Sequence, residues 1–222
     1  MRVRLLPKRP LTLILSHAGE RKYAGTVVRS VVVMILTPGE FSKQISKWYE
    51  IWRNSNPNYF PLEARLTQKA HTVGYLEMDD LVAITRVLGN SYNRRGKVRR
   101  SNTNEDIKEK TGAAIRNLAN PANAFLNVRC IREWGLTYAT KTLRCVCPRN
   151  YSALDSKLHK GIDRKYFPSR DETKRYLEFL SFCEQIRKMV TEPGPREGGE
   201  WFIGDVEIAL FQFVWDENNR II

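Results

Sequence analysis

The chain has 222 residues, 42% of them hydrophobic, and a formal net charge of +13 with an isoelectric point near 9.8. This length and apolar content are typical of a globular protein with one sizeable core, in one or two lobes, and they exclude a disordered chain. The excess of basic residues favours a polyanion as partner, either nucleic acid or an anionic membrane surface.

The N-terminal region begins with a basic segment, MRVRLLPKRPLTLILSH, which superficially resembles a secretion signal. The apolar run 11–15 is too short and no small-residue cleavage site follows it, so we expect no signal peptide. The run 31–36 is too short to span a bilayer. Residues 23–36 are rich in β-branched side chains and fit either a strand or a buried helix, and we expect a buried helix.

The cysteines and histidines show no metal-binding pattern. The four cysteines are not paired at zinc spacing, and the three histidines are scattered (Cys130, Cys145, Cys147, Cys183, His17, His71, His159). Buried, reduced thiols are the simplest interpretation and fit a cytoplasmic location. We therefore expect no metal, iron–sulfur cluster or other cofactor.

The first helices are indicated by capping residues and apolar periodicity. Thr37-Pro38-Gly39-Glu40 reads as a capping box with proline at the first helical position, and it opens a helix to about Arg53. A second helix is expected over 62–73, and a third opens at Asp79 and Asp80. The tryptophans of the first helix are expected to fill the core.

Residues 90–104, NSYNRRGKVRRSNTN, carry five basic and no acidic side chains and are expected to form a polar, flexible loop. Two interpretations are left open here. The segment is either a solvated surface loop or an arm that contacts phosphates, with Tyr92 stacking or wedging. The length of the loop favours a binding role.

Three later helices are expected on either side of the central stretch. Thr103 and Asp106 form a second capping box, for a helix to about Leu118. Ser169 and Glu172 form a third, for a helix to about Val190. Asp205 is expected to cap the last helix, after Trp201 and Phe202 re-enter the core.

The stretch 128–161, VRCIREWGLTYATKTLRCVCPRNYSALDSKLHKG, reads as a helix, a tight turn, a second helix, a loop and a third helix. Asn120-Pro121 starts the first helix, which runs to about Arg132, and Trp134-Gly135 ends it. The second helix begins near Thr137 and ends at Cys147-Pro148. Asp155 can cap the third. The turn and the helix N-terminus after it offer backbone N–H groups to an anion such as phosphate.

This stretch resembles the helix-hairpin-helix DNA glycosylases, in particular the branch related to 8-oxoguanine DNA glycosylase. Their pattern is G-h-G-x-x-h-A, an apolar helix, a proline, and an aspartate that opens the next helix. Gly135 matches the second glycine, Tyr138-Ala139 the apolar-alanine step, Pro148 the proline and Asp155 the aspartate. Weaker similarity extends to 74–89 and 205–216, and in total it covers about two thirds of the chain.

Two positions depart from the family pattern. Glu133 stands where the family has the first hairpin glycine. Thr137 stands where bifunctional members have a nucleophilic lysine, and threonine cannot form a Schiff base. Lys141 lies one helical turn further along, so it could face the same way, but it is not at the family position.

The resemblance implies that Asp155 is the catalytic carboxylate. Breaking an N-glycosidic bond gives the sugar oxocarbenium character, which one nearby carboxylate can stabilise while it also orients or deprotonates water. The base must first be flipped out of the duplex. An aspartate at a helix start is ordinarily a plain cap, but the hairpin before Asp155 favours catalysis. With Thr137 in place of the lysine, the enzyme is expected to be monofunctional, and Lys141 is the alternative nucleophile.

Further site residues are expected by resemblance and by charge. The hairpin backbone near Trp134 and Gly135 would hold a phosphate. Additional charge would come from side chains that, taken singly, read as solvated residues (Arg94, Arg95, Arg99, Lys141, Arg144, Lys157, Lys160). In relatives the base pocket takes residues from the hairpin and the last helix, which points here to Tyr138, Trp201, Asp205 and Gln212. For each of these four, core packing or capping is the favoured interpretation.

The sequence therefore predicts an all-α, two-lobed helix-hairpin-helix glycosylase fold in a single domain, 1–222. A helical lobe would span about 38–118, a hairpin lobe about 121–166, and C-terminal helices 169–216 would pack back on the core. The expected protein is a monomer that acts on double-stranded DNA and not on membranes. A non-catalytic DNA-binding protein is the main alternative, and an RNA-binding or RNA-processing protein is the third.

Overall fold

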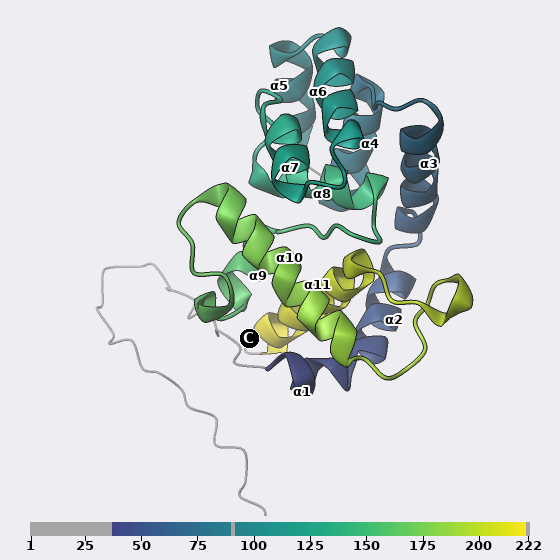
Figure 1. The fold of residues 1–222 in the computed structure, drawn as a ribbon, viewed down its shortest axis with the longest axis vertical. Helices are drawn as coiled ribbons and strands as arrows, with labels where there is room; N and C mark the ends of the chain where they lie inside the picture. The colour runs from purple at the N-terminus through teal and green to yellow at the C-terminus, as the bar shows by residue number, and fades with distance from the viewer. Residues whose placement is uncertain (1–36, 90–91, 221–222) are drawn as a thin grey trace, which may run out of the picture. The chain divides into compact units, whose positions relative to one another are not determined.

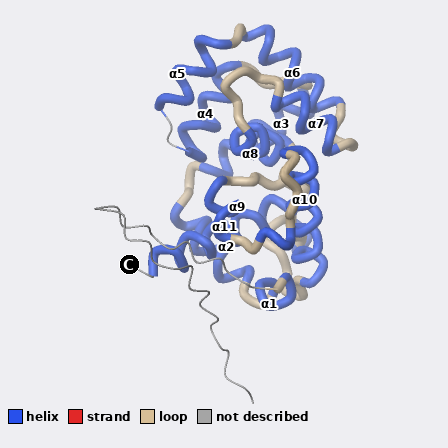
Figure 2. Tube along the Cα trace, turned by 90° about the vertical axis from the view of Figure 1, so that its left-hand side faces the viewer, coloured by secondary structure: helices blue, strands red, loops and turns tan. Residues whose placement is uncertain are grey.

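A computed structural model of the chain describes residues 37–89 and 92–220 (Figure 1). The expectations for the N-terminal segment, including the helix over 23–36, lie outside these residues. The described part contains eleven α-helices and two short 3₁₀ helices but no β-strand, as the blue and tan trace of Figure 2 shows. The all-α prediction is confirmed for this part of the chain.

The helices follow one another with short connections. They are α1 (Pro38–Ser42), α2 (Ile45–Ser55), α3 (Tyr59–Thr72), α4 (Met78–Gly89), α5 (Tyr92–Ser101), α6 (Asn104–Arg116), α7 (Pro121–Arg129), α8 (Leu136–Val146), α9 (Ser156–Gly161), η1 (Arg164–Tyr166), α10 (Glu172–Met189), η2 (Glu197–Gly199) and α11 (Ile203–Arg220).

The contacts between helices fall into two sets. Helices α3 to α8 contact mainly one another: α3 packs on α4 and α8, α4 on α5 and α8, and α7 on α6 and α8. The second set is built on α11, which packs on α2, α9 and α10, while α1 packs on α10. The pair α7 and α10 joins the two sets. The segment expected as one hairpin lobe is thus shared, since α8 belongs to the first set and α9 to the second.

Aromatic residues fill the core of the second set. The Phe213 ring of α11 lies 5.4 Å from that of Phe41 and 5.3 Å from that of Trp48. Trp48 and Trp52 are 2% and 5% exposed, so the expectation that they fill the core is confirmed. Burying side chains of this size stabilises the fold strongly, because each removes a large apolar area from water.

The capping predictions are confirmed at two of the three boxes. The Thr37 box with Glu40 and the Thr103 box with Asp106 both form reciprocal bonds. The helix after Thr37 is shorter than expected, because the chain turns at 43–44 before α2 begins. The third box is wrong: Asp171 caps α10 by accepting from the Lys174 N–H, and it takes the place expected for Ser169.

The basic segment expected as a loop forms helix α5. Lysine and arginine are good helix formers, so charge alone does not keep this segment irregular. Val98 is fully buried and ties the helix to the core. Asn102 follows the helix and binds the hairpin turn, since its amide donates to the Arg132 carbonyl and its oxygen accepts from the Arg132 N–H, both at 3.0 Å.

Candidate active site

The hairpin turn between α7 and α8 forms without its first glycine. Glu133 adopts a φ of 60°, in the left-handed region, and it is the only non-glycine residue with positive φ in the described chain. A glycine meets no steric cost there, whereas a side chain costs about 1–2 kcal/mol. Arg94 of α5 donates to the Glu133 carbonyl at 2.6 Å, which helps to hold the turn. Position 133 therefore has a backbone conformation typical of glycine although it carries a glutamate.

The N-terminus of α8 is left open. Gly135 is the N-cap, with φ −63° and ψ 176°, and no side chain caps the helix. A Cβ built on Gly135 would meet no atom within 4 Å, so no packing inside the described chain requires glycine there. The bare N-cap leaves room for a ligand to approach the first N–H groups of the helix, which attract anions.

Trp134 lies in the core under the hairpin. Its side chain is fully buried, its Nε1–H donates to the Thr142 hydroxyl at 3.0 Å, and its ring lies 5.0 Å from that of Tyr138. Only its backbone can take part in anion binding. The Trp134 side chain thus packs against α8. The expected DNA contact at this residue can involve only its main-chain atoms.

Asp155 lies at the start of α9, as the N-cap. One carboxylate oxygen, Oδ1, accepts from the Lys157 backbone N–H at 2.9 Å. The other oxygen, Oδ2, lies 3.0 Å from the Lys141 ammonium. The Asp155 side chain is 14% exposed, so the carboxylate is largely buried but retains a path to solvent. Asp155 therefore caps its helix with one oxygen and holds an ion pair with the other.

Lys141, and not Thr137, brings an amine to this carboxylate. Its side chain is 10% exposed, and its ammonium also donates to the Leu88 carbonyl at the end of α4, at 2.7 Å. Thr137 lies one turn earlier on α8 and makes only a long contact, 3.5 Å, to the Leu154 carbonyl. Lys141 therefore faces Asp155 in the structure.

The environment of Asp155 favours its charged form. Burial raises the pKa of the carboxyl, but the Lys141 ammonium and the hydrogen bond from the Lys157 N–H outweigh burial, and the pKa lies below 3.8. The group is therefore a carboxylate at neutral pH. The environment of Lys157 disfavours its charged form. Burial lowers the pKa of the Lys157 ammonium, and the nearby Lys141 charge lowers it further, whereas Asp155 raises it.

Two aromatic residues of α11 lie beside α9. The Lys157 ammonium is 3.0 Å from the centroid of the Trp215 ring, and Trp215 stacks with Phe211 at 6.2 Å. Trp215 is 41% exposed. The sequence prediction did not include this pair, although two aromatics four residues apart on the last helix are a signal for a shared face.

The four residues expected in a base pocket have different positions. Tyr138 is half-buried, with Lys141 at 5.5 Å and Arg94 at 5.9 Å from its ring centroid. Trp201 packs in the core and donates to the Glu192 carbonyl. Gln212 is 9% exposed and donates to Asp216 at 2.6 Å.

Asp205 is fully buried in an ionic cluster. Arg196 binds both its oxygens, at 2.6–3.1 Å, and the Phe202 N–H donates to it at 3.1 Å. Arg196 also pairs with the buried Glu63 at 2.8 Å. Of the four expected pocket residues, only Tyr138 lies near the Lys141 ammonium, which is 5.5 Å from its ring centroid.

The expected DNA-binding side chains are not equivalent either. Arg144 is 3% exposed, forms a buried ion pair with Glu207, and stacks over Tyr59 at 4.7 Å. The prediction that Arg144 contacts a phosphate is therefore wrong, because its guanidinium is buried in the core. Lys157 and Lys160 are exposed, as expected.

The basic residues of α5 include two that bind other parts of the protein. Arg99 pairs with the exposed Asp79 at 2.6 Å, and Arg94 binds the hairpin at Glu133. Arg94 thus contacts the hairpin turn, whereas Arg99 contacts α4. The phosphate-contacting interpretation of this segment therefore stays a prediction, now for a helix.

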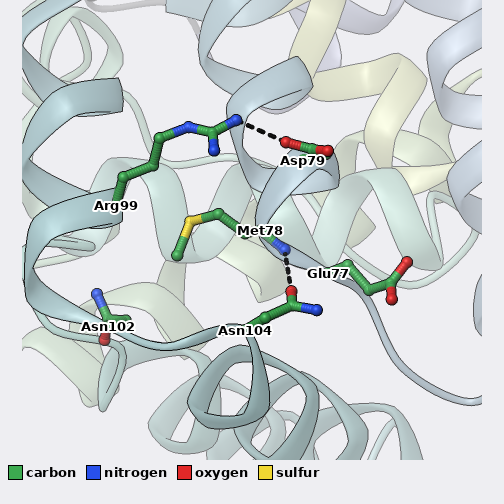
Figure 3. Close-up of a pocket in the computed structure, with 6 residues that line it drawn as sticks. All are labelled: Glu77, Met78, Asp79, Arg99, Asn102 and Asn104. Carbon is green, nitrogen blue, oxygen red and sulfur yellow. Dashed lines mark hydrogen bonds and ion pairs between the residues drawn. The ribbon is translucent and has the colours of Figure 1, made fainter.

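A separate cavity of about 430 Å³ opens between α4, α5 and α6. Figure 3 shows its lining, in which Arg99 binds Asp79 and the Met78 N–H donates to Asn104 at 2.9 Å. Apart from Arg99 it includes none of the expected site residues. Since Asp79 pairs with Arg99, and Glu77 pairs with Lys69 and Lys108, we place the candidate chemistry at Asp155 and not in this cavity.

Comparison of the chain with known protein families, curated proteins and solved structures finds no match. Within the described residues, no group of three His, Cys, Asp or Glu side chains is arranged to hold a metal ion. None of the described helices has the length and apolar character of a membrane span. The functional proposal therefore depends on the sequence motifs and on the geometry around Asp155.

Proposed function

We propose that the chain is a monofunctional DNA glycosylase of the helix-hairpin-helix type, which hydrolyses the N-glycosidic bond of a base flipped out of duplex DNA. The observation that carries the proposal is the Asp155 carboxylate. It is held at a helix start by the Lys141 ammonium and the Lys157 backbone N–H, and it is largely buried yet accessible. It follows an open hairpin whose turn keeps a left-handed residue at Glu133.

The chemistry needs a carboxylate that is ionised and fixed. As the glycosidic bond stretches, positive charge develops on the sugar, and a fixed negative charge beside it stabilises the transition state. The same oxygen can accept a proton from the attacking water. Asp155 meets the first requirement through its lowered pKa, and the Lys157 N–H and Lys141 fix its orientation.

Water is the proposed nucleophile. Thr137 cannot form a Schiff base, and the Lys141 amine is engaged by the Leu88 carbonyl and the Asp155 carboxylate. A protonated amine held in this way has no lone pair for attack. The product is then an abasic site in an uncut strand. The alternative, in which Lys141 attacks the sugar, predicts a covalent intermediate that borohydride reduces.

Bases would meet aromatic surfaces near the carboxylate. Trp215 and Phe211 present stacked rings beside Lys157, and Tyr138 presents a half-buried ring beside Lys141. Stacking on such rings holds an everted base without reading its identity. We propose 8-oxoguanine or a modified cytosine, such as the glucosylated hydroxymethylcytosine of phage DNA, as substrates. The second substrate would give the protein a role in antiviral defence.

The two-lobed glycosylase architecture belongs to the same proposal. The two sets of helices meet where Lys141 of α8 reaches Asp155 at the start of α9. Ligand sites occur preferentially between packed units of a fold. A monomer acting on double-stranded DNA in the cytoplasm fits the net charge of +13 and the four free cysteines.

A non-catalytic DNA-binding protein is the second candidate, because the open hairpin can hold phosphate without any chemistry. The two proposals differ at Asp155. Asparagine also caps helices, so Asp155→Asn should leave α9 and DNA binding intact in either case. An enzyme loses base release in this variant, whereas a binder has none to lose. Competition between DNA and RNA duplexes tests the third candidate, an RNA-binding protein.

The first experiment is incubation of the protein with genomic DNAs, both unmodified and phage-modified, followed by mass spectrometry of released bases. We expect one damaged or modified base to be released and the strand to remain uncut until alkali is added. Release of no base from any DNA, with binding intact, would favour the non-catalytic protein.

A further inference from the structure

A cationic cluster lies at the C-terminal end of α9, the opposite end of the helix from its capping aspartate. His159 and Lys160 form the last turn of α9, and Arg164 lies in η1, which leads towards α10 and Arg175 (Figure 1). Burial and then the positive charges of Arg175, Arg164 and Lys160 lower the pKa of His159 below 6.5. We call these four residues, from α9, η1 and α10, the α9–α10 cluster.

The cluster carries no compensating carboxylate. Among the described residues, none of its three permanent cations has an ion pair within 4 Å, although Lys165 of η1 and Arg187 of α10 each have one. The Nε–H of Arg175 is buried and has no hydrogen-bond partner. A buried donor without a partner costs about 1–3 kcal/mol, so an acceptor supplied from outside would be stabilising.

Aromatic residues pack beside the His159 member of the cluster. The His159 ring lies 6.1 Å from Phe167, which in turn packs on Phe179 and Phe182 of α10 at 5.6 and 6.4 Å. Phe167 and Phe179 are almost fully buried. The His159 side chain is therefore packed against the aromatic residues that join this segment to α10.

We propose that the α9–α10 cluster binds a backbone phosphate of duplex DNA and that His159 takes up a proton when it does so. This inference rests on the proposed function, because it extends the DNA path from the hairpin and Asp155 along α9. His159 lies four residues after Asp155, which is about one helical turn. Duplex DNA presents a closely spaced row of phosphates, so consecutive sites of this kind fit one strand.

The sign of the proton linkage follows from the charges. In the free protein three cations disfavour the imidazolium, and a phosphate among them reverses this effect. The complex then binds more protons than the free protein, so affinity rises as pH falls. The groups that face His159 are Arg175 of α10, Arg164 of η1 and Lys160 of α9. Of the four side chains in the cluster, only the histidine is of a type whose ordinary pKa lies close to neutral pH.

The test is the affinity for a duplex oligonucleotide, by fluorescence anisotropy from pH 7.5 to 5.5 and across salt concentration. We expect several-fold to about tenfold tighter binding at the lower pH, since one unit of pKa shift corresponds to tenfold. His159→Ala should remove this dependence, whereas His71→Ala, which removes an exposed histidine of α3, should retain it. Lys160→Ala with Arg164→Ala should reduce the salt slope by about 0.9, which is the contribution of one phosphate contact.

The matched control is Lys43→Ala with Lys110→Ala, which removes two lysines, one directly after α1 and one on α6. This control should change the salt slope less than the Lys160/Arg164 variant does. An unchanged pH dependence in His159→Ala, or an unchanged slope in the Lys160/Arg164 variant, would overturn the inference while leaving the glycosylase proposal standing if base is still released. Equal binding to phosphatidylserine vesicles would also overturn it. If the unaltered protein binds no duplex DNA, the inference and the proposed function fall together.

Discussion

Lys141 and Asp155 join the two sets of helices through one ion pair, with the ammonium 3.0 Å from the carboxylate oxygen Oδ2. Lys141 stands on α8 in the first set, and Asp155 opens α9 in the second. Both side chains are at least 86% buried, since their exposed fractions are 10% and 14%. This ion pair orients the Asp155 carboxylate and keeps it ionised. The proposed chemistry therefore depends on how the two sets of helices pack.

Replacing Lys141 by methionine should move the acid limb of base release to higher pH. Burial raises the pKa of Asp155, but in the native protein the Lys141 charge and the Lys157 N–H outweigh burial, so the pKa lies below its ordinary value. Without Lys141, burial acts with less opposition and the carboxyl takes up its proton at a higher pH. Single-turnover rates between pH 4 and 8 measure the shift. Arg129→Met, which removes a surface ion pair on α7, should leave the profile unchanged.

The same substitution tests stability. A carboxyl whose pKa is lowered by folding stabilises the native state above its unfolded pKa, and that stabilisation is lost as pH falls through the folded pKa. Lys141→Met should therefore flatten the acid dependence of the free energy of unfolding near pH 4. An acid limb and a stability profile both identical to those of the native protein would show that Lys141 does not control Asp155.

Borohydride should not trap the protein on substrate DNA. The Lys141 ammonium is bound by the Leu88 carbonyl and by Asp155, and Thr137 offers no amine. Denaturing gel electrophoresis after incubation with borohydride measures the covalent adduct, and base release in the same sample shows that the enzyme was active. An adduct that disappears in Lys141→Arg would instead establish Lys141 as the nucleophile.

Glycine at position 133 should give a more stable protein than alanine at the same position. Both substitutions remove the side chain and its contacts with Arg94 and Lys97, but the φ of 60° is strained only with a Cβ. We expect the free energy of unfolding of Glu133→Gly to be about 1 kcal/mol higher than that of Glu133→Ala, so the glycine variant is the more stable. Urea denaturation measures the difference. Equal stabilities would mean that the turn relaxes to another conformation when the glutamate is removed.

Much of the helical structure was predictable because its signals are local. The capping boxes at Thr37 and Thr103, the Asn120-Pro121 start of α7 and the Asp155 start of α9 all depend on residues within one turn, and all formed. The prediction failed where tertiary contacts decide. Helix α5 was read as a loop, although the burial of Val98 and the bonds of Asn102 hold it in place.

The site was predictable in part for the same reason. The Asp155 cap and the facing of Lys141 follow from helix spacing, whereas burial of Arg144 depends on Glu207, which lies sixty-three positions away. A basic residue on a helix gives no local sign of a distant carboxylate in the core. The Lys157–Trp215 contact likewise joins α9 to α11 and has no signal within either segment.

Thiol labelling tests the core independently of function. Burial raises the pKa of Cys145 to about 12 and that of Cys183 well above 9.0, while Cys130 is exposed. At pH 8 we expect Cys130 to react rapidly with a thiol reagent, Cys147 more slowly, and the other two only on unfolding. Mass spectrometry of labelled peptides identifies each site. Rapid labelling of Cys145 in the native protein would contradict the packing of α8.

The most direct test is the single-turnover rate of base release by Asp155→Asn, measured with saturating enzyme. Asp163→Asn is the matched control, because Asp163 caps η1 by the same type of bond, to the Lys165 N–H at 3.0 Å. We predict a loss of at least about 100-fold in Asp155→Asn with DNA affinity and melting temperature retained, and little change in Asp163→Asn. Base release at the native rate by folded Asp155→Asn would contradict a catalytic role for this carboxylate.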